Sequence, residues 1–108
     1  MTVSNKKDIG LKEEQLTSIQ ALAKKVPEIS KIILFGSRAK GTHKERSDVD
    51  LCLVLENPES SDSLHFKLDL EEETVIPYQF DVVYLDAIKD PRFKAEILNH
   101  GKIIYTKA

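Results

Sequence analysis

Two short apolar runs, separated by a polar and charged segment, constrain the fold of this chain more than any other feature. Residues 31–35 and residues 49–55 are short, apolar and partly β-branched, which predicts two buried strands. Between them we expect a short helix at 37–41 and a polar loop at 42–47. Ser37 follows the first run, and Asp48 and Asp50 stand at the start of the second. These residues can lie close together only if the two strands are antiparallel.

Gly36 and Ser37 end the first run, and Asp48 and Asp50 open the second. Glycine allows a tight turn and lets a phosphate approach free backbone amides closely. Residues two apart in a strand point to one face about 7 Å apart, which suits carboxylates that converge on divalent cations held roughly 3.5–4 Å apart. The simpler interpretations are a plain turn with Ser37 as a helix N-cap, and a solvated pair of aspartates at a strand start.

Taken together and in this order, the two motifs are more specific. Gly-Ser-Arg-Ala-Lys-Gly at 36–41, five further residues and Ser-Asp-Val-Asp-Leu at 47–51 resemble the signature of the minimal nucleotidyltransferases, within the DNA polymerase β-like superfamily. The resemblance extends over residues 11–105 and is tightest over 34–53. It implies an α/β (α+β) fold of the polymerase β-like nucleotidyltransferase type, with helices packed against a small mixed sheet.

The remaining segments are predicted to complete one domain. Residues 11–26 carry apolar side chains at helical spacing, and Pro27 ends that helix. Residues 62–73 fit either a strand or a helix. We favour a helix because the next predicted strand, 79–85, must run parallel to the strand at 49–55, and parallel neighbours need a crossover. The other expected elements are a turn at 57–61, a helix from Asp90-Pro91 to Gly101, and a last strand at 103–105.

A third carboxylate is expected at the same edge of the sheet. Asp81 interrupts an apolar run, and a charge inside a strand is costly unless it is paired or binds metal. Polymerase β-like enzymes carry a third carboxylate on the strand beside the Asp-x-Asp strand, and Asp81 matches that position. Asp86 is the competing candidate, although it has the character of a strand-exit or cap residue. A salt bridge to a lysine is the simpler role for Asp81.

Cations crowd the segment after the glycine–serine turn. Arg38 and Lys40 lie near the expected phosphates, so nucleotide binding and plain solvent exposure both stay open for them. His43 and Lys44 are interpreted as parts of a solvated loop. Cys52, on the face of the second strand that carries the aspartates, is interpreted as a small buried hydrophobe rather than a nucleophile or ligand.

Composition bounds the classes of function. The chain has 108 residues and a formal net charge of −2, so it lacks the basic balance typical of general nucleic-acid binding. A single cysteine excludes an intrachain disulfide and favours a cytoplasmic location, and no apolar run reaches the ~20 residues that span a membrane. We expect a flexible N-terminus at 1–10 and a single nucleotidyltransferase domain at 11–108.

The resemblance implies a magnesium-dependent enzyme that uses ATP. The phosphates would lie against Gly36 and Ser37, and Asp48, Asp50 and Asp81 would hold two Mg²⁺ ions. The third carboxylate would either complete the second metal site or act as the general base. Minimal nucleotidyltransferases are typically antitoxins paired with an all-helical HEPN toxin, so the implied acceptor of AMP is a tyrosine hydroxyl of that partner.

The acceptor site is the least determined part of this hypothesis. At this length we expect no second domain to present an acceptor, so the acceptor is expected to come from another chain. One alternative is a non-catalytic antitoxin that neutralises its partner by binding alone. A further alternative is a small-molecule nucleotidyltransferase of the aminoglycoside type, with a neighbouring subunit of an oligomer supplying the acceptor wall.

Overall fold

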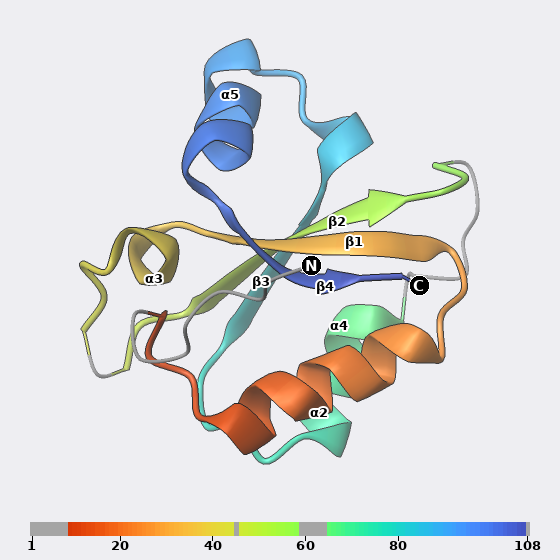
Figure 1. Ribbon diagram of the computed structural model, residues 1–108, viewed down its shortest axis with the longest axis vertical. Coiled ribbons are helices and arrows are strands. Elements are labelled where there is room, and N and C mark those ends of the chain that lie inside the picture. The colour runs from red at the N-terminus through yellow and green to blue at the C-terminus, as the bar shows by residue number, and fades with distance from the viewer. Residues whose placement is uncertain (1–8, 45, 59–64, 108) are drawn as a thin grey trace.

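A four-stranded mixed sheet forms the centre of the protein in the computed structural model, which describes residues 9–44, 46–58 and 65–107 (Figure 1). Its strands are β1 (Ile29–Phe35), β2 (Val49–Leu55), β3 (Phe80–Tyr84) and β4 (Lys102–Thr106). The strand order is β3-β2-β1-β4. β1 is antiparallel to β2 and to β4, whereas β2 and β3 are parallel. The predicted directions of the first three strands are confirmed, and the structure places the last strand beside the first.

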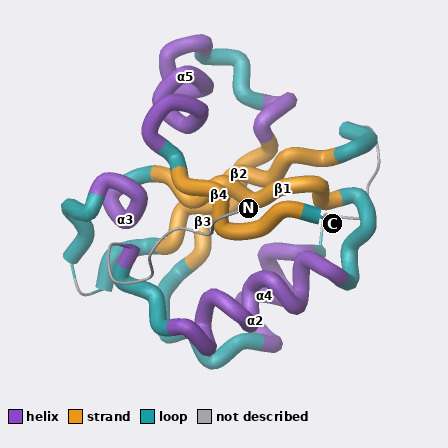
Figure 2. The backbone as a smooth tube through the Cα atoms, viewed as in Figure 1, coloured by secondary structure: helices purple, strands orange, loops and turns teal. Residues whose placement is uncertain are grey.

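Helices cover both faces of this sheet (Figures 1 and 2). On one face lie α2 (Glu13–Lys24) and α4 (Phe66–Glu73), and on the other lies α5 (Pro91–His100). α4 connects the parallel strands β2 and β3, which confirms the predicted crossover helix. Residues 62–64 of that predicted helix lie outside the described residues.

The pleat of the strands divides the core into two layers. Leu51 and Leu53 of β2 are fully buried in the larger cluster, together with apolar side chains of α2 and α4. The intervening Cys52 packs in a smaller cluster with Ile97 of α5. Because both faces of the central strands are covered, β1 from Ile32 to Phe35 and β2 from Leu51 to Leu55 are continuous apolar runs rather than alternating ones.

The first turn of α5 fixes where this helix begins. Asp90 Oδ1 accepts a hydrogen bond from the Arg92 backbone N–H at 2.9 Å, and Pro91 occupies the first helical position, as predicted. Ile97 is fully buried, whereas the next residue, Leu98, is 55% exposed. Consecutive residues lie about 100° apart around a helix, so a narrow contact centred on one residue leaves the next outside it.

The packed part of the chain begins before the expected domain boundary at residue 11. Ile9 is fully buried, and the carbonyl oxygens of Ile9 and Gly10 accept hydrogen bonds from the side chain of Arg38. The rest of the predicted flexible N-terminus, residues 1–8, lies outside the described residues, as do 59–61 of the predicted turn. Within the described segments, every helix is too short or too polar to cross a membrane.

Candidate active site

The strand register brings the three predicted carboxylates to one end of the sheet. Asp50 of β2 is paired with Phe35 at the end of β1 on one side and with Asp81 of β3 on the other. Asp48 lies two residues before Asp50, immediately ahead of β2. Asp86 lies in the 3-10 turn η1 (Leu85–Ala87), beyond the far end of β3. The register therefore places Asp81, and not Asp86, beside Asp50.

These carboxylates act on one another electrostatically. Burial raises the pKa of the Asp50 carboxyl above its ordinary 3.8, the negative charges of Asp81 and Asp48 raise that pKa further, and the positive charge of Arg38 opposes them. Among the described residues, however, no three His, Cys, Asp or Glu side chains are grouped closely enough to hold a metal ion. Asp50 thus interacts with the two other carboxylates through their charges at a distance.

Gly36 gives the turn after β1 a close approach to Asp50. Its φ of +76° lies where side chains are disfavoured, and a Cβ atom built on it would collide with Oδ2 of Asp50. Gly36 is also the N-cap of the short helix α3 (Ser37–Lys40). Ser37 is therefore the first helical residue and not the cap, and the structure shows no side-chain hydrogen bond at this cap.

The donor set at this edge fits magnesium. Carboxylate oxygens are the ligands that Mg²⁺ prefers, and a divalent cation would offset both the burial and the mutual repulsion that raise the pKa of Asp50. Because Gly36 has no Cβ, its backbone lies close against the Asp50 carboxylate, whose Oδ2 occupies the space that a Cβ would fill. Backbone and carboxylate can therefore face a common ligand there.

Arg38 lies in an environment that its sequence position did not indicate. Its side chain is only 1% exposed and packs over the ring of Tyr78, with the guanidinium carbon 4.4 Å from the ring centroid. Nε and Nη2 donate to the Ser47 carbonyl oxygen at 3.3 and 2.8 Å, and Nη1 donates to two more carbonyl oxygens at 3.1 Å. A nucleotide-binding role for Arg38 would require these hydrogen bonds to be given up.

Lys40 remains exposed and links α3 to α5. Its Nζ forms an ion pair with Glu96 of α5, and the hydrogen bond from Lys40 lowers the pKa of the Glu96 carboxyl. Nearby, Phe93 of α5 packs edge to face on Phe35, the last residue of β1, with ring centroids 5.6 Å apart. The first half of α5 therefore lies next to the glycine–serine turn, on the face of the sheet that carries Asp50.

The loop before Asp48 and the cysteine after it are mostly as expected. Lys44 is exposed, and its backbone N–H donates to Ser47 Oγ at 2.7 Å. His43 departs from the prediction of a solvated residue, because it is half-buried against Gly10 and its Nδ1 is buried without a hydrogen-bond partner. Cys52 is fully buried, and desolvation raises the pKa of its thiol to about 11, so it remains protonated at neutral pH.

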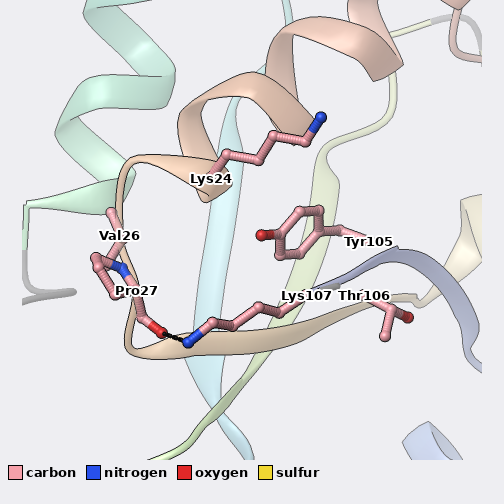
Figure 3. Close-up of a pocket in the computed structure, with 6 residues that line it drawn as sticks. All are labelled: Lys24, Val26, Pro27, Tyr105, Thr106 and Lys107. Carbon is pink, nitrogen blue, oxygen red and sulfur yellow. Dashed lines mark hydrogen bonds between the residues drawn. The ribbon is translucent and has the colours of Figure 1, made fainter.

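A separate hollow lies at the opposite end of β1 (Figure 3). It has a volume of about 370 Å³, and Tyr105 forms part of its wall. Lys107 crosses its rim, donating from Nζ to the Pro27 carbonyl oxygen and to Glu56 at 2.9 Å each. None of the carboxylates at the candidate site lines this hollow. Its lining is formed by Lys24, Val26, Pro27, Tyr105, Thr106 and Lys107.

The fold and the carboxylate edge together define a nucleotidyltransferase domain. Residues 17–108 match the family model described as "Polymerase beta, Nucleotidyltransferase". The match covers most of the chain, and the chain belongs to this family. No curated protein sequence matches it.

Solved structures show the same fold. A chain of a toxin–antitoxin crystal structure with AMP-PNP superposes with a TM-score of 0.68 at 20% identity, over 90% of this chain and 75% of that chain. A chain of the toxin–antitoxin MntA-HepT superposes with a TM-score of 0.65 at 16% identity, over 89% of this chain and 74% of that chain.

The sequence indicated no contact of Ser47, Tyr78 or Glu96 with the site, to which the structure links them through Arg38 and Lys40. Ser47 directly precedes the Asp-x-Asp motif, so its position was an available signal. The other two residues carry no such local signal, because their partners lie about 40 and 56 residues away in the chain.

Proposed function

We propose that this chain is a magnesium-dependent nucleotidyltransferase that transfers AMP from ATP to a hydroxyl group of a partner protein, a tyrosine of a HEPN-type toxin, and so acts as an antitoxin. The observation that carries the proposal is the β2–β3 register, which places Asp50 beside Asp81, with the Gly36 backbone in close approach to the Asp50 carboxylate. Membership of the nucleotidyltransferase family supports the reaction class. The toxin–antitoxin neighbours, one of them with the ATP analogue AMP-PNP, support the nucleotide and the biological role.

Each residue of the site has a defined part in this reaction. Asp48, Asp50 and Asp81 would hold two magnesium ions, which supply charge neutralisation on the triphosphate and a lower pKa of the acceptor hydroxyl. The backbone amides that follow Gly36 would contact the phosphates, and the exposed ammonium of Lys40 would neutralise the leaving group.

The proposed step is an in-line displacement at the α-phosphorus. The acceptor oxygen forms a bond to this phosphorus while the bond to the bridging oxygen breaks, and pyrophosphate leaves with the electron pair of that bond. The proton of the acceptor hydroxyl passes to a carboxylate or to water. Asp81 is exposed on an edge strand, where it can accept that proton if it does not bind metal.

Mass spectrometry of the helical partner protein tests this proposal. The partner is incubated with this chain, ATP and Mg²⁺, beside a double Asp48→Asn, Asp50→Asn variant and an Asp86→Asn control. We expect a mass gain of one or more AMP units with the wild type and Asp86→Asn, and none with the double variant. An unmodified but neutralised partner would contradict the catalytic proposal.

The toxin–antitoxin neighbours also fit one alternative, an antitoxin that works by binding alone. Neutralisation of the partner separates the two functions. If the double variant still neutralises the toxin as well as the wild type does, binding alone accounts for the activity. If neutralisation is lost while the complex still forms, transfer of AMP is required.

A further inference from the structure

Arg38 is a buried cation held by backbone carbonyls. Its guanidinium group makes four hydrogen bonds to the carbonyl oxygens of Ser47, Ile9 and Gly10, and the aromatic ring of Tyr78 covers one face. Burial of a charge is costly unless its donors are satisfied, and carbonyl dipoles satisfy them here. The hydrogen bonds offset the desolvation of the guanidinium group, and they also restrain the backbone segments that supply the carbonyls.

The segments that Arg38 joins are those that carry the candidate site. Arg38 itself follows the Gly36–Ser37 turn, and Ser47 directly precedes Asp48. Tyr78 lies three residues before Asp81, on the chain segment that enters β3. One guanidinium group therefore connects the Gly36–Ser37 turn, the start of the strand that carries Asp50, and the segment that leads into β3.

From these contacts we propose that Arg38 is a positioning residue of the candidate active site, which holds the Ser47 carbonyl and thereby sets where Asp48 and Asp50 stand relative to the glycine–serine turn. The effect of Arg38 on the rate of AMP transfer rests on the proposed function. The structural part does not, because it concerns only how the guanidinium restrains the backbone at Ser47.

The contacts require an arginine. Two donors of one planar group converge on the Ser47 carbonyl oxygen, while Nη1 reaches the carbonyl oxygens of Ile9 and Gly10 in another direction. A lysine ammonium keeps the charge but is a point donor on a flexible stem, and it cannot span these directions at once. Arg38→Lys therefore separates the positioning effect from the effect of the charge.

Two measurements test the proposal on the full chain. Hydrogen–deuterium exchange is followed at the amides of Ser47, which donates to the Lys44 carbonyl, and Val49, which donates to the Gln79 carbonyl. AMP transfer is measured in parallel as kcat and as KM for ATP. Gln20→Ala serves as the matched control, because it removes a side-chain hydrogen bond of 2.8 Å to the Ile104 carbonyl, between α2 and β4.

We expect Arg38→Lys to speed exchange at Ser47 and Val49 by about tenfold relative to Gln20→Ala. We also expect kcat to fall by at least about tenfold while KM for ATP changes by less than about threefold, since misplacement of a reacting group by a fraction of an ångström lowers the rate more than the binding. Tyr78→Leu, which removes only the ring over the guanidinium, should change both quantities in the same direction by a smaller factor.

Two outcomes would overturn or redirect this inference. Exchange in Arg38→Lys equal to that of Gln20→Ala would remove the positioning role. A raised KM for ATP with kcat unchanged would instead assign Arg38 to the nucleotide. If the wild type transfers no AMP, the proposed function fails, and the exchange measurement alone decides the positioning role. Should Arg38→Lys not fold, the same measurements on Tyr78→Leu decide it.

Discussion

Asp50 carries an electrostatic cost when no cation is bound. Its folded-state pKa is raised above the ordinary 3.8 by burial and by the charges of Asp81 and Asp48. The folded state therefore holds this proton more tightly than the unfolded state does, and stability falls as pH rises from 3.8 through the raised pKa. At neutral pH the whole cost is present, and a bound divalent cation is the natural means of offsetting it.

Removal of this charge should stabilise the metal-free protein. In EDTA at pH 7 we expect Asp50→Asn to raise the unfolding temperature by about 2–4 °C, a value kept small because water screens a half-exposed carboxylate. The gain should disappear below pH 3.8, where the wild-type carboxyl is also protonated. Thermal unfolding followed by circular dichroism measures this.

Asp86→Asn is the control, since this exposed carboxylate lies at the other end of β3. An equal stabilisation by Asp86→Asn would show a general effect of net charge instead of repulsion at the site.

Gly36 is the second residue whose local geometry has consequences for the site. We expect Gly36→Ala to destabilise the fold by about 1–3 kcal/mol, because its φ and ψ of +76° and −153° suit glycine alone and because the new Cβ would displace the Asp50 carboxylate. AMP transfer should be lost in this variant. Urea denaturation and the transfer assay measure the two effects.

Gly41→Ala provides the comparison, since Gly41 also has a φ of +76° but is exposed and ends α3. It should cost about 1 kcal/mol through its left-handed backbone and keep AMP transfer. If both alanine variants keep activity, the close approach at Gly36 is not needed for the reaction.

At the scale of elements, the ion pair between Lys40 and Glu96 joins α3 to α5 beside the turn. Both side chains are substantially exposed, at 50% and 42%, so the pair is expected to add little to stability. Its greater effect is on the availability of Lys40, because an ammonium held by a carboxylate is less free to meet a phosphate.

Glu96→Gln should release Lys40 for the nucleotide. We expect the unfolding temperature to stay near that of the wild type and KM for ATP to fall by about two- to fivefold at low ionic strength. The difference should shrink as added salt screens the ion pair. Steady-state kinetics at two salt concentrations test this, and a rise in KM would show that Glu96 supports nucleotide binding instead.

At the scale of the whole molecule, the sheet unites segments that are distant in the chain. β1 and β2 meet as antiparallel neighbours, β3 joins β2 in parallel through the α4 crossover, and α5 covers the face that carries Asp50 (Figure 1). Binding of a ligand at the site should therefore stabilise the entire domain and not one loop. The residues that would contact the ligand, Gly36, Asp50 and Asp81, come from segments up to 45 residues apart in the chain.

Ligand binding should be visible as a cooperative gain in stability. Mg²⁺ and AMP-PNP at about a hundredfold excess over Kd should add about 2.7 kcal/mol, or roughly 10 °C in unfolding temperature for a domain of this size. The Asp48→Asn, Asp50→Asn variant should gain far less under the same conditions. An equal gain in both proteins would place the nucleotide elsewhere.

Much of the fold and part of the site could be predicted from local sequence. The apolar runs located β1, β2 and β3, Asp90-Pro91 marked the start of α5, and the need for a crossover indicated that α4 is a helix. These features depend on residues near one another in the chain, where strand length, caps and turn geometry act directly. The side-by-side placement of Asp50 and Asp81 was expected from the resemblance to polymerase β-like enzymes and is confirmed by the register.

By itself, then, the sequence determined the order and type of the elements and the chemical character of the carboxylate edge. Only the tertiary structure decided that Arg38 is buried among carbonyls, that Lys40 is paired with Glu96, and that Ile9 belongs to the core. The physical reason is that each of these outcomes depends on residues tens of positions away. Their proximity follows from strand register and helix packing, for which the local pattern holds no signal.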